Sequence, residues 1–250
     1  MSDVYGIQAV RGVLRDAPKR ARQLYLVRGR RDARVNELIS LARDAGVRYQ
    51  SVEPAWFKQR LDKSMQQDVV HQGVLLECHE LAMADAAELD ERWPDFGAQP
   101  LILVLDGVTD PRNFGACLRT ADAAGVNVVI VPKRNSAPLS PVALKTAQGG
   151  AENLLIVSVT NLARTLKSLQ QRGVWVVGAD GGAKQTYAQI NAQGPLAVVM
   201  GSEGKGLRRL TRDCCDVLVQ IPMAGLVSSL NVSVATGVLL FEVQRQRQLA

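Results

Sequence analysis

The stretch IPMAGLVSSLNVSVA, residues 221–235, runs from a short apolar segment through a loop into an apolar segment with helical spacing. Pro222 and Gly225 predict the loop. A helix start needs only one capping Ser or Asn, yet several such side chains crowd together here. Polar groups in an apolar setting need hydrogen-bond partners, and either a bound ligand or the backbone at the helix entry can supply them. The spacing leaves both open. The polar residues are Ser228, Ser229, Asn231 and Ser233.

Two earlier segments have a similar setting, because each follows an apolar run. DGVTDPRNFGACLR (106–119) follows residues 101–105, and GSEGKGL (201–207) follows residues 196–200. Apolar strand-like runs alternate with segments of helical spacing throughout this half, which predicts a parallel sheet covered by helices. We expect strands at 101–105, 126–131, 154–159, 174–178, 196–200 and 217–221, and helices at 114–124, 141–148, 162–171, 207–213 and 230–246.

The same alternation is typical of dinucleotide-binding folds, but their phosphate-binding motifs are missing. The first strand of this half is followed by DGVTDP rather than by GxGxxG, and no acidic ribose partner stands at the expected distance. The late glycine-rich loop is not a P-loop either, because Gly206 follows Lys205 where Ser or Thr is required. A nucleotide-dependent dehydrogenase is therefore disfavoured.

The chain divides near residues 79–98, which are acidic, contain proline and predict a linker with some helix at 81–89. Residues 99–250 form the domain described above. Residues 1–78 alternate between strand and helix periods and predict a small α/β domain. We expect its helices at 7–14, 35–45 and 57–61, and its strands at 24–27, 47–52 and 74–76.

The charge of the chain is +6, and its distribution points to a polyanionic partner. Residues 1–80 carry 14 Lys and Arg against 10 Asp and Glu. Nine basic residues lie between Arg11 and Arg34, and only two acidic ones interrupt them. Such a cluster attracts nucleic acid through charge and counterion release. The RNA-binding candidates in it are Arg11, Arg28, Arg30 and Arg31.

Other features narrow the class. No run of about 18 apolar residues predicts a membrane span, and the N-terminus lacks the pattern of a secretory signal. The four cysteines form no CxxC pair or zinc-ligand spacing, and with two histidines there is little material for a metal site. We therefore expect a cytoplasmic protein without a metal.

In this order, the three segments 106–119, 201–207 and 221–235 resemble the motifs of the SpoU (TrmH-like) branch of the SPOUT RNA methyltransferases. The resemblance covers essentially the whole chain. It implies a C-terminal SPOUT domain with a deep trefoil knot, which periodicity never suggests, and an N-terminal L30e-like domain that binds RNA. It also implies a homodimer that methylates, with S-adenosylmethionine, the 2′-oxygen of a guanosine in large-subunit 23S ribosomal RNA.

The resemblance assigns roles to residues of all three motifs. Backbone groups at Gly201, Ile221 and Leu230 would bind the cofactor, with Met223 and Ser229 near it. Glycines lack side chains, so a ligand can approach their backbone closely; a tight strand-to-helix turn is the alternative reason for them.

Arg119 is the leading catalytic candidate. A guanidinium has no acceptor and a pKa above about 12, so it suits stabilisation of the developing alkoxide or a grip on a phosphate better than removal of a proton. Asn113 is expected to cap the following helix and to orient Arg119 or the RNA. Glu203 would fix Asn113 or Arg119, or receive a proton through water. Ser229 would contact a phosphate or the cofactor, and Asn231 would position the arginine; helix capping is the alternative for both.

Two other functions stay open. One is a transfer-RNA 2′-O-methyltransferase of the same branch, whose members more often extend the catalytic domain with basic tails. The other is a non-catalytic factor that binds ribosomal RNA. The complete set of polar motif residues argues against it. The apolar stripe Val234, Val238 and Phe241 fits either a dimer interface or the core.

Overall fold

The structure, a computed structural model, describes residues 2–30, 32–63, 71–79 and 81–249. The chain forms two compact units, Met1–Ala82 and Met83–Ala250. The elements of the first unit are β1 (Ser2–Tyr5), α1 (Ile7–Asp16), β2 (Ala21–Val27), α2 (Ala33–Asp44), β3 (Arg48–Val52), α3 (Pro54–Lys63) and β4 (Val74–Cys78), with a 3-10 turn at Pro18–Arg20.

The first unit is built on a mixed four-stranded sheet in the order β1-β4-β2-β3. β2 and β3 are parallel, and β4 is antiparallel to both β1 and β2. Side chains alternate between the faces of a strand, so the sheet supports two separate cores. One buries residues of α1 and α2, including Val10 and Leu38, and the other surrounds Phe57 of α3.

His71 has a structural role in this unit. Its Nδ1 accepts a hydrogen bond from the backbone N–H of Gly73 at 3.0 Å, and its ring stacks on Phe57 with centroids 4.8 Å apart. These contacts fix the turn that leads into β4.

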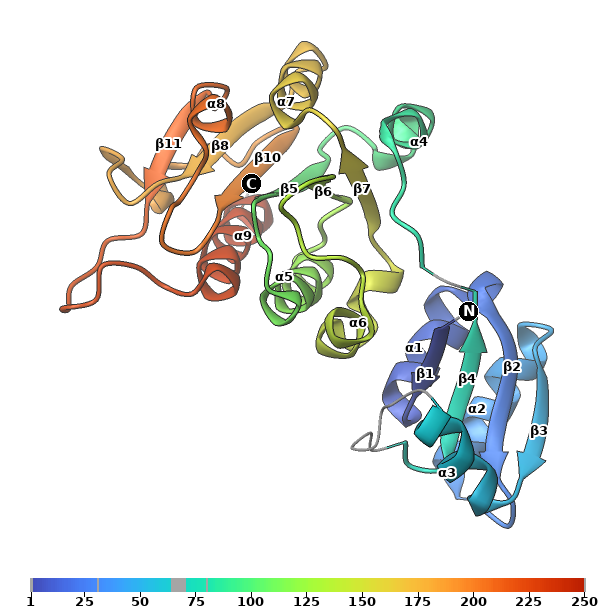
Figure 1. Cartoon of the computed structure of the whole chain (residues 1–250). Helices are drawn as coiled ribbons and strands as arrows, with labels where there is room; N and C mark the ends of the chain where they lie inside the picture. Colours follow the sequence, from blue (N-terminus) through green and yellow to red (C-terminus); the bar gives the residue numbers. More distant parts are fainter. Residues whose placement is uncertain (1, 31, 64–70, 80, 250) are drawn as a thin grey trace. The chain divides into compact units, whose positions relative to one another are not determined.

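The second unit contains β5 (Leu101–Asp106) and a series of strands and helices that follow it (Figure 1). Ahead of them lies the short helix α4 (Ala86–Arg92), with a 3-10 turn at Trp93–Phe96. The helices and strands after β5 are α5 (Pro111–Ala123), β6 (Val128–Pro132), α6 (Pro141–Ala147), β7 (Leu155–Val159), α7 (Leu162–Gln171), β8 (Trp175–Ala179), β9 (Gln185–Thr186), β10 (Leu196–Gly201), α8 (Arg209–Arg212), β11 (Val217–Gln220) and α9 (Val232–Gln248).

These strands form an all-parallel sheet in the order β7-β6-β5-β10-β8-β11-β9. Figure 1 shows α5, α6 and α9 on one face of the sheet, and α4, α7 and α8 on the other. Both faces are covered, so the strands β5, β6 and β10 are almost entirely apolar; every residue of β5 is buried. The predicted parallel sheet is confirmed.

Residues 83–98 pack with this second unit. Ala84 forms a parallel bridge with Val157, and its carbonyl accepts from Ser158 N–H at 2.8 Å. Leu89 of α4 is 4% exposed and joins the core cluster around β7 and α7. The observed division falls after Ala82. The expected domain boundaries, 1–78, 79–98 and 99–250, remain predictions.

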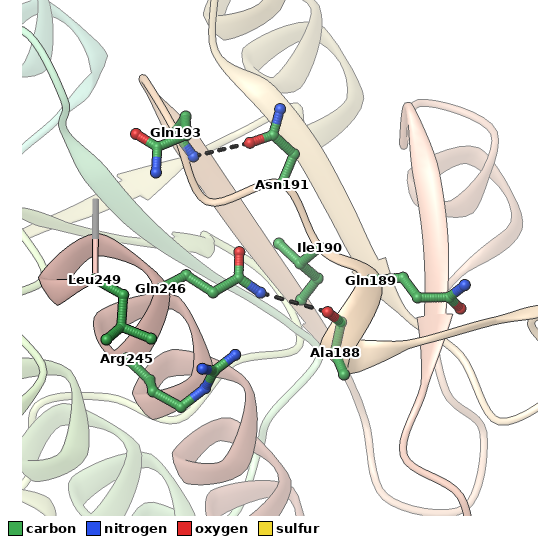
Figure 2. Close-up of a pocket in the computed structure, with 8 residues that line it drawn as sticks. All are labelled: Ala188, Gln189, Ile190, Asn191, Gln193, Arg245, Gln246 and Leu249. Atoms are coloured by element: carbon green, nitrogen blue, oxygen red, sulfur yellow. Dashed lines mark hydrogen bonds between the residues drawn. The ribbon is translucent and has the colours of Figure 1, made fainter.

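Side-chain hydrogen bonds hold the C-terminal helix α9 against the segment that precedes β10. At its last turns, Arg247 donates to the carbonyls of Ala192 and Gly194, at 3.0 and 2.7 Å. Figure 2 shows the neighbouring hollow, where the Gln246 amide points to the carbonyl of Ala188. Arg245, which also lines this hollow, is paired with Glu242. No helix among the described residues is both long and apolar enough to cross a membrane.

Candidate functional site

A pocket of about 600 Å³ lies where β8, β10 and β11 end. These three strands are neighbours in the sheet and run parallel, so the loops that follow them meet at one edge. In open α/β sheets, ligands bind outside this carboxyl edge. All five predicted cofactor residues line the pocket, although nothing in the structure tests their role. They are Gly201, Ile221, Met223, Ser229 and Leu230.

Three motif side chains, from the first turn of α5, the loop after β10 and the start of α9, form one hydrogen-bonded cluster beside this pocket. The Asn113 amide donates to Glu203 Oε1 at 3.0 Å. The Asn231 amide donates to the same oxygen at 2.5 Å and to Asn113 Oδ1 at 3.0 Å. Bonds to a carboxylate are stronger than neutral ones, so Glu203 ties the starts of α5 and α9 to the loop after β10. We call these residues the Asn113–Glu203–Asn231 cluster.

The expectation that Asn113 caps α5 is wrong. The helix begins at Pro111, and Asp110 is its cap: the carboxylate accepts from Arg112 N–H at 2.7 Å and from Asn113 N–H at 3.0 Å. Proline is favoured at the first helical position and an acidic residue just before it. Asn113 is therefore free to bond across to Glu203.

Asn231 serves two purposes. Its Oδ1 accepts from Ser233 N–H at 2.9 Å, which caps α9, while its amide nitrogen joins the cluster. The alternative of helix capping is thus confirmed for Asn231 without excluding a second role. Ser228 and Ser229 are exposed, so water can satisfy their hydroxyl groups and neither needs an internal hydrogen-bond partner.

The loop 201–207 requires glycine at three positions for two different structural reasons. A Cβ on Gly201 would lie 2.2 Å from the backbone carbon of Gly206, because the loop folds back through paired bonds between Ser202 and Gly206. Gly204 and Gly206 have φ of +75° and +65°, the region that favours glycine. The tight turn accounts for all three, and a ligand contact adds to it rather than replacing it.

Asp106 is a site residue that the sequence analysis missed. It ends β5, is fully buried, and accepts from the Arg208 backbone N–H at 3.1 Å and from its Nε at 2.6 Å. A buried carboxylate needs such a partner. The pair locks the end of the loop 201–207 onto the first motif. Its only sequence signal was an aspartate at the end of an apolar run.

Arg119 lies apart from the cluster. Its side chain is exposed, does not line the pocket, and has no hydrogen-bond or ion-pair partner among the residues that the structure describes. Its Cα packs beside the short 3-10 turn at Gly150, where a Cβ would come within 3.1 Å. The expected contacts of Glu203 and Asn231 with Arg119 are not formed; Asn113 receives them instead.

The RNA-binding candidates of the first unit are ion-paired. Arg11 pairs with Glu37 at 2.5 Å, Arg28 with Glu53 at 2.5 Å, and Arg30 with Asp32 at 2.6 Å. Exposed pairs of this kind contribute little and exchange partners readily. Arg31 lies outside the described residues.

The cysteines are free. Burial raises the pKa of the Cys117 thiol to about 11 and that of Cys215 to about 12. Thiols with such a raised pKa are poor nucleophiles. Among the described residues, no group of three or more His, Cys, Asp or Glu is placed to hold a metal ion.

Residues 100–241 match the SpoU rRNA Methylase family, and residues 4–84 match the RNA 2'-O ribose methyltransferase substrate binding family. The chain belongs to the SpoU rRNA methylase family.

Full-length relatives agree. The chain is 52% identical over 249 residues to the 23S rRNA (guanosine-2'-O-)-methyltransferase RlmB of Pseudomonas putida, covering 100% of this chain and 98% of the relative. It is 54% identical over 244 residues to RlmB of Pseudomonas aeruginosa, covering 98% and 96%.

Among solved structures, the SpoU methyltransferase AviRb from Streptomyces viridochromogenes in complex with AdoMet shares this fold, with a TM-score of 0.79. It is 24% identical and covers 99% of this chain and 91% of its own. The A. aeolicus TrmH/SpoU tRNA modifying enzyme has a TM-score of 0.57 and 29% identity, covering 65% of this chain and 85% of its own.

Proposed function

We propose that this chain transfers a methyl group from S-adenosylmethionine to the ribose 2′-oxygen of a guanosine in 23S ribosomal RNA. The observation that carries the proposal is a pocket lined by the second and third motifs and tied to the first motif by the Asn113–Glu203–Asn231 cluster, in a chain about half identical over its full length to the RlmB methyltransferases of Pseudomonas. AviRb, of the same fold, has a structure in complex with AdoMet.

The pocket suits this cofactor. Its volume of about 600 Å³ lies within the usual range for small-molecule sites. Its lining combines the Gly201–Gly206 backbone with hydroxyl groups and two carboxylates, of Asp180 and Glu203, against the single cation Lys205. An acidic lining favours a ligand that carries a sulfonium cation.

When bound, the cofactor supplies an electrophilic methyl group, and the chain supplies position and charge. The Asn113–Glu203–Asn231 cluster keeps the first, second and third motifs in register around the pocket. Positioning of this kind contributes several kcal/mol, on the order of 7–11 at most, to lowering a barrier.

We assign Arg119 to the RNA rather than to the cofactor, because it is exposed and does not line the pocket. Its guanidinium can grip a phosphate or stabilise the alkoxide that develops on the 2′-oxygen. Glu203 Oε2 has no hydrogen bond among the described side chains, whereas Oε1 holds both asparagines. Oε2 is thus available to accept the hydroxyl proton through a water.

The first unit is assigned to RNA selection, since residues 4–84 match a substrate-binding family. This match is the observation that favours ribosomal over transfer RNA, because the A. aeolicus tRNA enzyme corresponds to only 65% of this chain. We further propose an L30e-like fold for this unit, a cytoplasmic location, and a trefoil knot in the second unit, supported by the return of its last segment beside α5.

A homodimer is also proposed. Val234 and Phe241 are each 53% exposed on α9 and Val238 is half-buried, so the two ends of the apolar stripe are not core. A second copy of this chain would cover it. Light scattering of the purified protein and of Phe241→Glu tests this: a dimer that becomes a monomer supports the interface, and a wild-type monomer overturns it.

The function is tested by incubating the protein with labelled S-adenosylmethionine and unmodified 23S ribosomal RNA, then mapping the methylated nucleotide. Transfer RNA in a parallel reaction separates the two substrate classes. A single 2′-O-methylguanosine in 23S RNA is expected. Methylation of transfer RNA alone would contradict the proposed substrate, and no transfer to either RNA would contradict the enzyme.

A further inference from the structure

Asp180 is a pocket carboxylate outside the three motifs. It stands immediately after β8. Of the sheet neighbours of β8, β10 ends at the predicted cofactor residue Gly201, and β11 ends one residue before Ile221, which is another. Its side chain is 15% exposed and lines the same pocket. The three strand ends therefore present a backbone, a carboxylate and a second backbone side by side.

The carboxylate is held in place from one side only. Oδ1 accepts from the Gly182 N–H at 2.9 Å and faces Arg212 Nη2 at 3.4 Å. The backbone of Asp180 is fixed as well, because its N–H donates to Val219 of β11 at 2.9 Å. Oδ2 has no hydrogen-bond partner among the described residues, and the approach over Gly181 is open, with no atom within 4 Å of a Cβ built there.

The other carboxylate of the pocket is less suited to the hydroxyl groups of a ligand. Glu203 Oε1 is engaged by Asn113 and Asn231, its Oε2 is the atom assigned above to the proton of the 2′-hydroxyl, and Lys205 is a donor. A carboxylate with four acceptor sites, two of them engaged, suits a pair of neighbouring hydroxyl groups. Acidic side chains play this part for ribose in other nucleotide folds.

We infer that Asp180 is a cofactor-binding residue that accepts hydrogen bonds from the ribose hydroxyls of the adenosyl group, with Arg212 as its positioning residue. The inference rests on the proposed function, because it requires an adenosyl cofactor in this pocket. It adds a side-chain determinant to a set of contacts that otherwise come mostly from the backbone. A ligand without the ribose hydroxyls leaves the Asp180 carboxylate desolvated and unpaired, which weakens binding.

Calorimetry on the full-length chain tests the contact directly. The probes are S-adenosylhomocysteine, its 2′-deoxy and 3′-deoxy analogues, and 5′-methylthioadenosine, which keeps the ribose and lacks the amino-acid end. In the wild type, we expect removal of a bonded hydroxyl to weaken binding about 10- to 100-fold, as for hydrogen bonds to charged groups.

In Asp180→Ala, the affinities for S-adenosylhomocysteine and for methylthioadenosine should fall by a similar factor. Removal of a ribose hydroxyl from the ligand should then change its affinity by no more than about twofold, because the carboxylate that bonds the hydroxyl is gone. Asp180→Asn keeps the shape of the side chain, and a melting temperature equal to that of the wild type shows that loss of binding in this variant does not come from a disordered loop. The matched control is Asp213→Asn, which removes an exposed carboxylate of the same unit that does not line the pocket, and it should bind like the wild type.

Three results would overturn the contact. In the first, Asp180→Ala still loses affinity when a ribose hydroxyl is removed, which would mean that the residue only shapes the loop. In the second, Asp180→Ala binds methylthioadenosine as tightly as the wild type does, which would mean that the carboxylate meets the amino-acid end of the cofactor. In the third, Asp180→Ala binds every probe like the wild type. Each leaves the proposed function standing as long as the wild type binds S-adenosylhomocysteine. A wild type that binds none of the probes overturns the proposed function and the inference together.

Discussion

Arg119 and Asn113 belong to one motif but lie on different stripes of α5. They are six residues apart, and a helix turns about 100° per residue, so their side chains diverge by about 120°. Asn113 shares its stripe with Cys117, whose Sγ lies 3.6 Å from Thr236 Oγ1 on α9. The motif thus has an inward polar residue for the cluster and an outward cation for a partner. Sequence spacing gave both residues, but it could not give the partner of either.

Arg119→Ala is expected to abolish methyl transfer while cofactor affinity and stability stay close to wild type, since the side chain touches neither the pocket nor any described partner. Arg119→Lys should also be poor, because an ammonium cannot reproduce a two-pronged contact. Single-turnover transfer and calorimetry measure the two properties. Arg164→Ala, an exposed arginine on α7, is the control. Near wild-type turnover in Arg119→Ala would rule out the role.

The buried thiol of Cys117 should make the free energy of unfolding fall at alkaline pH. Burial raises the pKa of its thiol to about 11, whereas an unfolded cysteine titrates near about 8.5. Below the lower value both states hold the proton and stability is unaffected. As pH rises through the window between the two, the unfolded chain alone loses it, and the fold is weakened. Urea unfolding at pH 7.5 and pH 10 should show a smaller pH dependence in Cys117→Ala than in wild type; equal dependence in both would remove Cys117 as a cause.

At the scale of elements, the apolar runs predicted all six long strands of the second unit, with ends within about two residues. They missed β1 and β9. Serine and aspartate open β1, and β9 has only two residues, so neither carries a period. The helix expected at 207–213 shrinks to Arg209–Arg212 because Gly206 and the Asp106–Arg208 pair hold the preceding loop. Long-range pairs of this kind have no local signal.

Gly115 shows how a motif residue can act through packing. A Cβ there would lie 2.3 Å from the carbonyl oxygen of Ala143 on α6 and 2.8 Å from Thr146. Gly115→Ala should therefore force α5 and α6 apart and lower the free energy of unfolding by about 1–3 kcal/mol.

Gly237→Ala on α9 is the matched control. Its Cβ would meet Thr120 at 3.7 Å, an ordinary contact, and alanine is favoured over glycine in a helix by about 1 kcal/mol. This variant should unfold at the same denaturant concentration or higher. A Gly115→Ala protein as stable as Gly237→Ala would mean that α6 moves aside without cost.

At the scale of the whole molecule, the two units divide after Ala82, within the acidic, proline-containing segment, but composition could not say to which unit that segment packs. Ala84 and Leu89 settle that for residues near them, since both are buried in the second unit. A chain that begins at Met83 should therefore be more stable than one that begins at Gln99, by at least the about 1.5–3 kcal/mol of one buried leucine.

Both truncated chains should bind S-adenosylmethionine and lose affinity for RNA, because the first unit is absent from each. Thermal unfolding, calorimetry and RNA gel shifts measure the three properties. Equal stability of the two truncated chains would show that the contacts of residues 83–98 do not stabilise the second unit. Unchanged RNA affinity would show that the second unit selects the RNA.

Salt separates the two ligands of the whole molecule. Each phosphate that the protein neutralises should add roughly 0.7–0.9 to the slope of log affinity against log salt. The proposed cofactor carries no phosphate and its proposed contacts lie within a pocket, where salt screens charges less, so its affinity should depend on salt only weakly. Replacing Arg28, Arg30 and Arg31 with Glu should weaken RNA binding and flatten its slope, with cofactor affinity unchanged. Arg28 and Arg30 must release Glu53 and Asp32 to do this, which costs little for exposed pairs. Lys133 and Arg134 are exposed after β6 in the second unit, and a second variant that replaces both with Glu tests whether the other phosphate contacts lie there. If the triple variant keeps the wild-type slope while this double variant flattens it, the phosphates are bound by the second unit and the arginines of the first unit are a solvated surface.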